Sequence, residues 1–82
     1  MNRVKLLFFA TLRDRAGTRS MELEIPPELT VQGLKDKLSD EYPNLKESMK
    51  SVLITINREY AFDEAVIPQS AEVAMFPPVS GG

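Results

Sequence analysis

The sequence predicts an α+β fold: a mixed sheet of four to five strands with one main helix on one face and a short helix after the first strand. Two observations carry this prediction. Several short runs are apolar on both sides or alternate apolar and polar residues, as strands do, whereas one longer run places apolar residues at helical spacing. The order along the chain is strand, strand, helix, strand, short strand, strand, so the helix is expected to pack across a single sheet.

The first strand is expected over residues 4–10, where both faces are apolar apart from Lys5. Such a run is typical of a strand in the middle of a sheet. Thr11 and Asp14 then fit a capping box with Thr11 as the N-cap of a short helix, and Gly17 suits the end of that helix.

The second strand is expected over residues 20–25, which alternate apolar and polar side chains and end at two prolines. Thr30 is the expected N-cap of the main helix, Gly33 weakens this helix, and Pro43 ends it. Its apolar residues recur at helical spacing and are Val31, Leu34, Leu38 and Tyr42.

The second half of the chain predicts three further strands. After a polar connection over residues 44–51, the β-prone run 52–56 leads through a turn at Asn57-Arg58 into a short strand over 59–62. An irregular connection over 63–71 precedes the last strand, residues 72–76. The first and last strands carry few charges, so both are expected side by side in the middle of the sheet, which is the β-grasp arrangement.

Strand alternation predicts a second apolar face that the helix does not cover. The residues expected toward the helix are Val4, Leu6, Phe8, Val52, Ile54, Ile56, Val73 and Met75. The residues expected on the open face are Leu7, Phe9, Leu53, Ala74 and Phe76, with Tyr60 joining them from the short strand. Exposed apolar area of this kind suggests a docking patch for a partner. The alternative is that the connection 63–71 folds over the patch.

Composition restricts the chemistry available to this chain. Its 82 residues predict one β-grasp domain over 1–76 followed by a flexible tail over 77–82. The 12 acidic and 10 basic residues are well mixed, and no apolar run is of spanning length, so neither nucleic acid nor a membrane is an expected partner and a cytoplasmic location is expected. Cysteine and histidine are absent, which removes the usual nucleophiles, general bases and metal ligands; no metal site is expected.

The C-terminal segment is the expected reactive part of the chain. Strand 72–76 breaks into Pro77-Pro78, which hold the chain extended, and the sequence ends on Gly81-Gly82. A glycine terminus lacks Cβ, so its backbone can enter a narrow channel and bring the last carboxylate against a partner's catalytic atoms. Six extended residues reach roughly 20 Å. The alternative is an ordinary frayed terminus.

The segment Glu72-Val73-Ala74-Met75-Phe76-Pro77-Pro78-Val79-Ser80-Gly81-Gly82, together with Leu7-Phe8-Phe9-Ala10, resembles the family of molybdopterin synthase small subunits, ubiquitin-like β-grasp proteins that carry sulfur. The resemblance covers essentially the whole chain. It implies that an ATP-dependent, E1-like activating enzyme adenylates Gly82 and that a terminal thiocarboxylate follows. It also implies sulfur donation to cyclic pyranopterin monophosphate, which forms the dithiolene of molybdopterin during molybdenum cofactor biosynthesis.

The same resemblance implies a heterotetramer in which the large synthase subunit supplies the catalytic side chains and this chain binds no permanent cofactor. Gly81 and Gly82 would form the reactive terminus. The expected partner-binding residues are Phe9, Tyr60, Phe76, Pro77, Pro78, Val79 and Ser80. Two other functions stay open: a ubiquitin-like protein modifier, whose terminus would form an amide with a lysine, and a sulfur carrier for thiazole synthesis.

Overall fold

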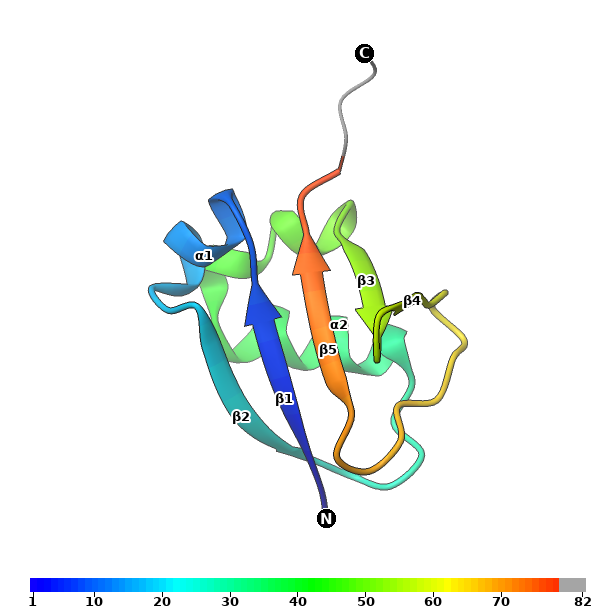
Figure 1. The fold of residues 1–82 in the computed structure, drawn as a ribbon. Helices are drawn as coiled ribbons and strands as arrows, with labels where there is room; N and C mark the ends of the chain where they lie inside the picture. Colours follow the sequence, from blue (N-terminus) through cyan, green and yellow to red (C-terminus); the bar gives the residue numbers. More distant parts are fainter. Residues whose placement is uncertain (79–82) are drawn as a thin grey trace.

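The computed structural model describes residues 1–78 and contains one five-stranded mixed sheet with helix α2 across one face (Figure 1). The strand order is β2-β1-β5-β3-β4. The strands are β1 (Asn2–Phe8), β2 (Ser20–Ile25), β3 (Leu53–Ile56), β4 (Glu59–Tyr60) and β5 (Glu72–Phe76). The helices are α1 (Thr11–Ala16), α2 (Val31–Glu41) and the short 3₁₀ turns η1 (Pro43–Leu45) and η2 (Ser48–Lys50). The predicted α+β class is confirmed.

The first and last strands lie side by side in the middle of the sheet, as predicted. They are parallel, with Lys5 opposite Glu72 and Phe8 opposite Met75. Strand β2 pairs antiparallel with β1, and β3 pairs antiparallel with β5. Because β1 and β5 are parallel, their C-terminal ends lie at the same end of the sheet, where the chain continues from β1 into α1 (Figure 1). The segment after Phe76 therefore starts beside the end of β1.

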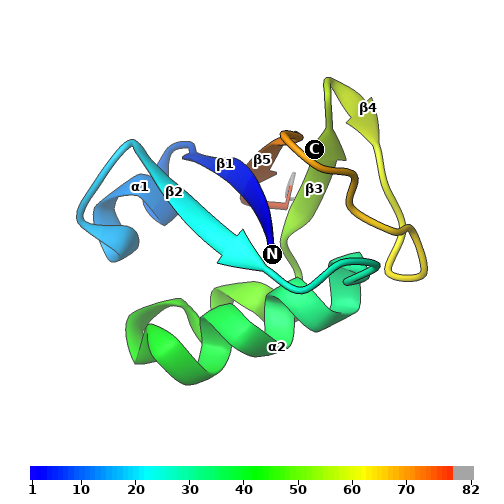
Figure 2. The ribbon, with the colours of Figure 1, turned by 90° about the horizontal axis from the view of Figure 1, so that it is seen from below.

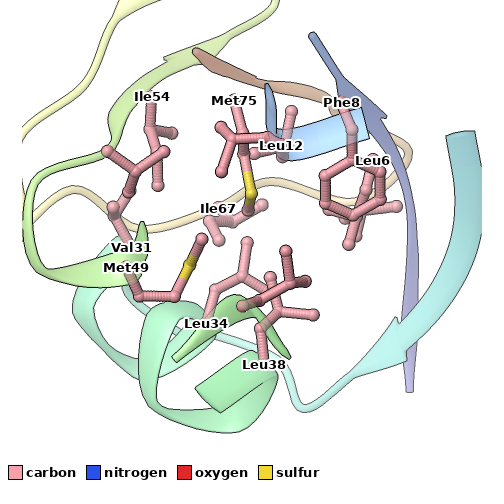
Figure 3. Close-up of a cluster of buried hydrophobic side chains, with 14 of the residues drawn as sticks. Leu6, Phe8, Leu12, Val31, Leu34, Leu38, Met49, Ile54, Ile67 and Met75 are labelled. Atoms are coloured by element: carbon pink, nitrogen blue, oxygen red, sulfur yellow. The ribbon is translucent and has the colours of Figure 1, made fainter. Parts of the chain in front are cut away.

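The hydrophobic core fills the space between the sheet and α2 (Figures 2 and 3). The predicted helix-facing residues lie there: all are buried except Ile56, which is half-buried and packs against the core. Leu12 from α1 and Ile67 from the connection before β5 complete the core. No membrane-crossing helix, long and apolar enough for that purpose, occurs within residues 1–78.

Helix α2 begins as predicted at the Thr30 cap, whose hydroxyl accepts a hydrogen bond from the Gly33 N–H at 3.1 Å. It ends one residue before the predicted Tyr42. Packing explains the glycine at position 33, because a Cβ there would lie 2.5 Å from the Leu29 Cδ1 atom. The glycine thus lets Leu29 lie directly against the first turn of α2.

The predicted capping box of α1 is wrong. The N-cap is Ala10, with φ 53° and ψ −128°, and no side chain caps this end. The Leu12 N–H instead donates to the Phe9 carbonyl at 3.1 Å, so a tight turn with a positive φ at its second residue starts the helix. Gly17 ends α1 in the left-handed conformation, as predicted.

Other details also differ from the sequence prediction. Strand β1 covers Asn2–Phe8 instead of residues 4–10, and β3 begins at Leu53 instead of Val52. The segment 44–51 is not simply a polar connection, because its two 3₁₀ turns bury Leu45 and Met49 in the core. The short strand ends at Tyr60 instead of Phe62. The turn before it is confirmed, since Asn57 and Arg58 both have positive φ, at 50° and 73°, which is typical of a two-residue hairpin turn.

Candidate docking face at the root of the C-terminal segment

Within residues 1–78 no segment covers the face of the sheet opposite α2, and this face carries the predicted aromatic residues. Figure 1 looks onto this open face. Tyr60 is 76% exposed and Phe9 is 42% exposed, while Phe76 is half-buried. Leu7 and Leu53 are half-buried beside them. The alternation of strand residues therefore identified this surface correctly.

Ala74 is the exception among the residues predicted for the open face. It is only 7% exposed, although Val73 and Met75 on either side of it face the core. Its side chain is small, so its larger neighbours on the sheet screen it from solvent. Ala74 can form the floor of a docking surface but offers almost no contact area.

Phe9 and Phe76 stack on each other with ring centroids 4.7 Å apart and an angle of 8° between the ring planes. The backbone positions them. Phe76 is the last residue of β5, and the Phe9 N–H donates to the Met75 carbonyl at 3.2 Å just beyond the end of β1. An aromatic pair in this geometry contributes about 0.5–1.5 kcal/mol beyond the area it buries.

A hollow of about 480 Å³ lies beside this aromatic pair. Pro77 closes one side of the hollow and is half-buried, whereas Pro78 is exposed. The lining residues are Phe9, Ala10, Leu53, Thr55, Arg58, Tyr60, Phe76 and Pro77. A hollow of mostly apolar lining at the start of the C-terminal segment can accept an apolar side chain of a partner protein.

The connection before β5 does not cover this hollow. It lies instead against the start of α2, where the Val31 N–H donates to the Ala65 carbonyl at 2.9 Å. Lys35 and Asp63 form an ion pair of 2.6 Å at the same place. Ile67 is fully buried on the helix side. The predicted alternative, in which this connection shields the open face, is therefore wrong.

Three arginines lie beside the aromatic pair, and no pattern in the sequence singles them out. Arg13 and Arg19 line a second hollow of about 360 Å³ that also contacts Phe9. Arg58 lines the larger hollow on the other side. Arg58 is far from Arg13 and Arg19 in the sequence, and the three belong to no motif, so only the tertiary structure places them on the same face.

The electrostatic shifts within the described residues lie away from the aromatic pair. The Lys50 ammonium donates a hydrogen bond to the Glu47 carboxylate, which lowers the pKa of Glu47 and raises the pKa of Lys50. Both belong to the η2 region on the helix side of the molecule. The pKa of Arg3 is raised by its hydrogen bond to Glu24. Four of the predicted site residues, Val79, Ser80, Gly81 and Gly82, lie outside the described residues.

The five-stranded mixed sheet, the central parallel pair and the single helix across one face define a ubiquitin-like β-grasp domain. The chain belongs to the ThiS family, whose model matches residues 6–82. The molybdopterin synthase sulfur carrier subunit of Arabidopsis thaliana is 35% identical over 79 residues, which cover 96% of this chain and 82% of the plant protein.

Two solved structures extend the comparison. The solution structure of small archaeal modifier protein 1 from Methanosarcina acetivorans is 31% identical, with a TM-score of 0.76, and covers 100% of this chain and 98% of its own. The complex of subunits 1 and 2 of the molybdopterin-converting factor from Helicobacter pylori contains a chain with a TM-score of 0.70. That chain is 20% identical, covering 98% of this chain and 99% of its own, and shows the shared fold.

Proposed function

We propose that this protein is the sulfur carrier subunit of a molybdopterin synthase, with the sulfur bound at the Gly82 carboxyl carbon. The observation that carries the proposal is the uncovered aromatic pair Phe9/Phe76 beside Pro77, in a member of the ThiS family. A docking face at the root of the C-terminal segment lets the β-grasp body bind a partner while the terminus reaches that partner's active site. Six extended residues beyond Phe76 span roughly 20 Å.

The chemistry proposed for Gly82 begins with activation of its carboxylate. A carboxylate oxygen attacks the α-phosphorus of ATP on an E1-like activating enzyme, and pyrophosphate leaves. A hydrosulfide equivalent (HS⁻) then attacks the carbonyl carbon of the acyl-adenylate, the bond to the phosphate oxygen breaks, AMP leaves, and loss of the S–H proton gives the thiocarboxylate. Activation is needed because a free carboxylate is a poor electrophile, whereas the mixed anhydride carries a good leaving group.

The thiocarboxylate formed in this way would donate its sulfur to cyclic pyranopterin monophosphate in the large synthase subunit. This division of roles agrees with the composition, because a chain without histidine or cysteine lacks the usual acid–base and nucleophilic side chains. The large subunit would supply those groups. Phe9, Tyr60 and Phe76 would hold the body against it.

The test of this proposal is a change at the last residue. Deleting Gly82, or adding one residue after it, is expected to abolish both ATP–pyrophosphate exchange with the cognate activating enzyme and sulfur transfer. Thermal melts serve as the control, because residues 1–76 contain every helix and strand of the described structure. An extended chain that exchanges pyrophosphate at the wild-type rate without being processed would contradict the carrier function.

Gly81 tests how the terminus enters the partner. Gly81→Val restricts the backbone and adds a β-branched side chain, so it is expected to slow single-turnover sulfur transfer much more than it weakens the complex. Affinity for the large subunit and the transfer rate are measured separately. Equal losses in both quantities would mean that the variant disturbs docking instead of passage through a channel.

A protein modifier is the second candidate, favoured by the 31% identity with small archaeal modifier protein 1. Both functions begin with the same adenylation and differ in the group that attacks the activated carbonyl, sulfur or an amine. The intact mass of the protein from its native cell separates them. A terminal thiocarboxylate raises the mass of the chain by the difference between one sulfur atom and one oxygen atom. A modifier appears instead as covalent conjugates with larger proteins.

A further inference from the structure

The open face has a cationic rim as well as an apolar centre. We propose that Arg13, Arg19 and Arg58 form this cationic rim and that it steers docking of a partner whose contact surface carries carboxylates around an apolar anchor. The inference rests on the proposed function for the identity of the partner, the large synthase subunit. It adds the charge of the surface that the partner must present.

The three arginines flank the aromatic pair from both sides. Arg13 of α1 and Arg19 before β2 share their hollow with Phe9, and Arg58 shares the other hollow with Phe9 and Phe76. Strands β2 and β4 are the two edges of the sheet, so the rim residues approach the central aromatic pair from opposite directions (Figure 1). A side chain seated in the hollow beside Phe76 would lie next to Arg58, with Arg13 and Arg19 in the second hollow beyond Phe9.

None of these arginines forms an ion pair within residues 1–78. The four pairs found there are Arg3–Glu24, Lys35–Asp63, Lys37–Glu41 and Lys50–Glu47. The three cations that line these two hollows therefore keep their charge available to a partner. Arginine is suited to this role, because its planar guanidinium can bind a carboxylate through two parallel hydrogen bonds.

The opposite end of the same face carries charges of both signs, which favours a protein over a polyanion. Strand alternation puts Glu22, Glu24 and Glu72 on the open face, far along β1 and β5 from Phe9, with Arg3 opposite Glu24 and Lys5 opposite Glu22 and Glu72. Arg3 and Glu24 form an ion pair of 2.9 Å. A nucleic acid crossing this face would meet these carboxylates, whereas a protein can match a basic end and a mixed end separately.

Rim charges are expected to act mainly on the rate of association. Solvent-exposed charges around an interface steer diffusional encounter and are screened by salt, while buried apolar contacts set the dissociation rate. The test variant is the triple substitution R13Q/R19Q/R58Q. The matched control is R15Q/K46Q/K50Q, which also removes three positive charges.

The control residues lie on the helix side of the molecule. Lys46 and Lys50 line a polar hollow against α2. The pKa of Glu47 is lowered first by its hydrogen bond from Lys50 and, to a smaller extent, by the charge of Arg15, which puts Arg15 near η2. Both triple variants have the same net charge, so a difference between them reports where the charges lie.

The experiment measures association and dissociation rates with the cognate large subunit by stopped flow at about 50 mM and 500 mM NaCl, after thermal melts confirm folding. We expect R13Q/R19Q/R58Q to associate about tenfold or more slowly than the control variant at low salt. The association rates of the two variants should become similar at high salt, and their dissociation rates should stay close to that of the wild-type chain. Equal association rates of the two variants at both salt concentrations would contradict the proposed steering role of the cationic rim. A wild-type chain that does not bind the large subunit would instead contradict the proposed function, and with it the role of the rim.

Discussion

At the scale of single residues, two adjacent phenylalanines have opposite roles. Phe8 is 2% exposed and packs in the core with Leu6 and Met75, whereas Phe9 is 42% exposed and stacks on Phe76 across the open face. One step along a strand reverses the direction of a side chain. The same residue type therefore stabilises the fold at one position and offers a contact at the next.

Substituting one residue from each face should separate folding from docking. Phe8→Ala opens a core cavity and is expected to cost about 3–5 kcal/mol of unfolding free energy. Phe76→Ala should cost only about 1 kcal/mol of folding, from the lost aromatic stack, but about 2 kcal/mol or more of binding. Urea unfolding of each variant and calorimetric titration with the large subunit measure the two effects. Normal binding by Phe76→Ala would mean that the docking face lies elsewhere.

Ala10 is the residue with the least favourable backbone near the docking face. Its φ of 53° and ψ of −128° suit glycine, and an alanine held in such a region costs on the order of 1–3 kcal/mol. Ala10→Gly relieves that strain but increases the freedom of the unfolded chain, which costs about 0.5–1 kcal/mol. We expect a net gain of about 1 kcal/mol in urea unfolding. Ala16→Gly, inside α1, is the matched control and should lose about 1 kcal/mol.

At the scale of elements, the sequence predicts those features that depend on neighbouring residues. The five strands, the Thr30 cap and the Asn57-Arg58 turn each depend on neighbouring residues, and the structure contains all of them. The segment 44–51 was missed as a structured part of the core. Its two apolar residues, four apart in a polar stretch, are too few to establish a period, and they become buried only because α2 and α1 lie next to them.

The same holds for the candidate docking face: the sequence predicts the parts of it that depend on local patterns. Alternation along β1 and β5 follows from the sequence, so Phe9 and Phe76 could be assigned to one face. Two prolines and two glycines likewise mark the C-terminal segment in the sequence alone. The cationic rim could not be found in this way, because Arg58 comes to the same face as Arg13 and Arg19 only when the sheet has formed. The sequence places Arg58 about half the chain away from the other two.

The sequence predicts both Thr11 and Thr30 as N-caps, but in the structure only Thr30 caps its helix, which gives a test at the element scale. Thr30→Ala removes the acceptor of the 3.1 Å hydrogen bond from Gly33 and should cost about 1 kcal/mol of unfolding free energy. Thr11→Ala removes no cap, since α1 has no side-chain cap, and should change stability by less than about 0.5 kcal/mol. If both variants lose the same unfolding free energy in urea, Thr11 caps α1 in solution after all.

At the scale of the whole molecule, the elements that stabilise the fold and the segment proposed to react are consecutive but separate in the chain. Every helix and strand of the described structure lies within residues 2–76, and the core contains no residue beyond Met75. Pro77 borders the aromatic hollow and is half-buried. Removing the last six residues should therefore leave the body nearly intact while removing the reactive group.

A chain truncated after Phe76 is the corresponding test. We expect its unfolding free energy to stay within about 1 kcal/mol of the full chain, because of the two described residues removed, Pro77 and Pro78, only Pro77 borders the aromatic hollow. It should still compete with the full chain for the large subunit, through Phe9, Tyr60 and Phe76, but with weaker affinity, and it should support no sulfur transfer. Urea unfolding and a competition titration measure these outcomes. A truncated chain that folds normally yet does not compete at all would show that residues 77–82, and not the open face, provide the main docking contacts.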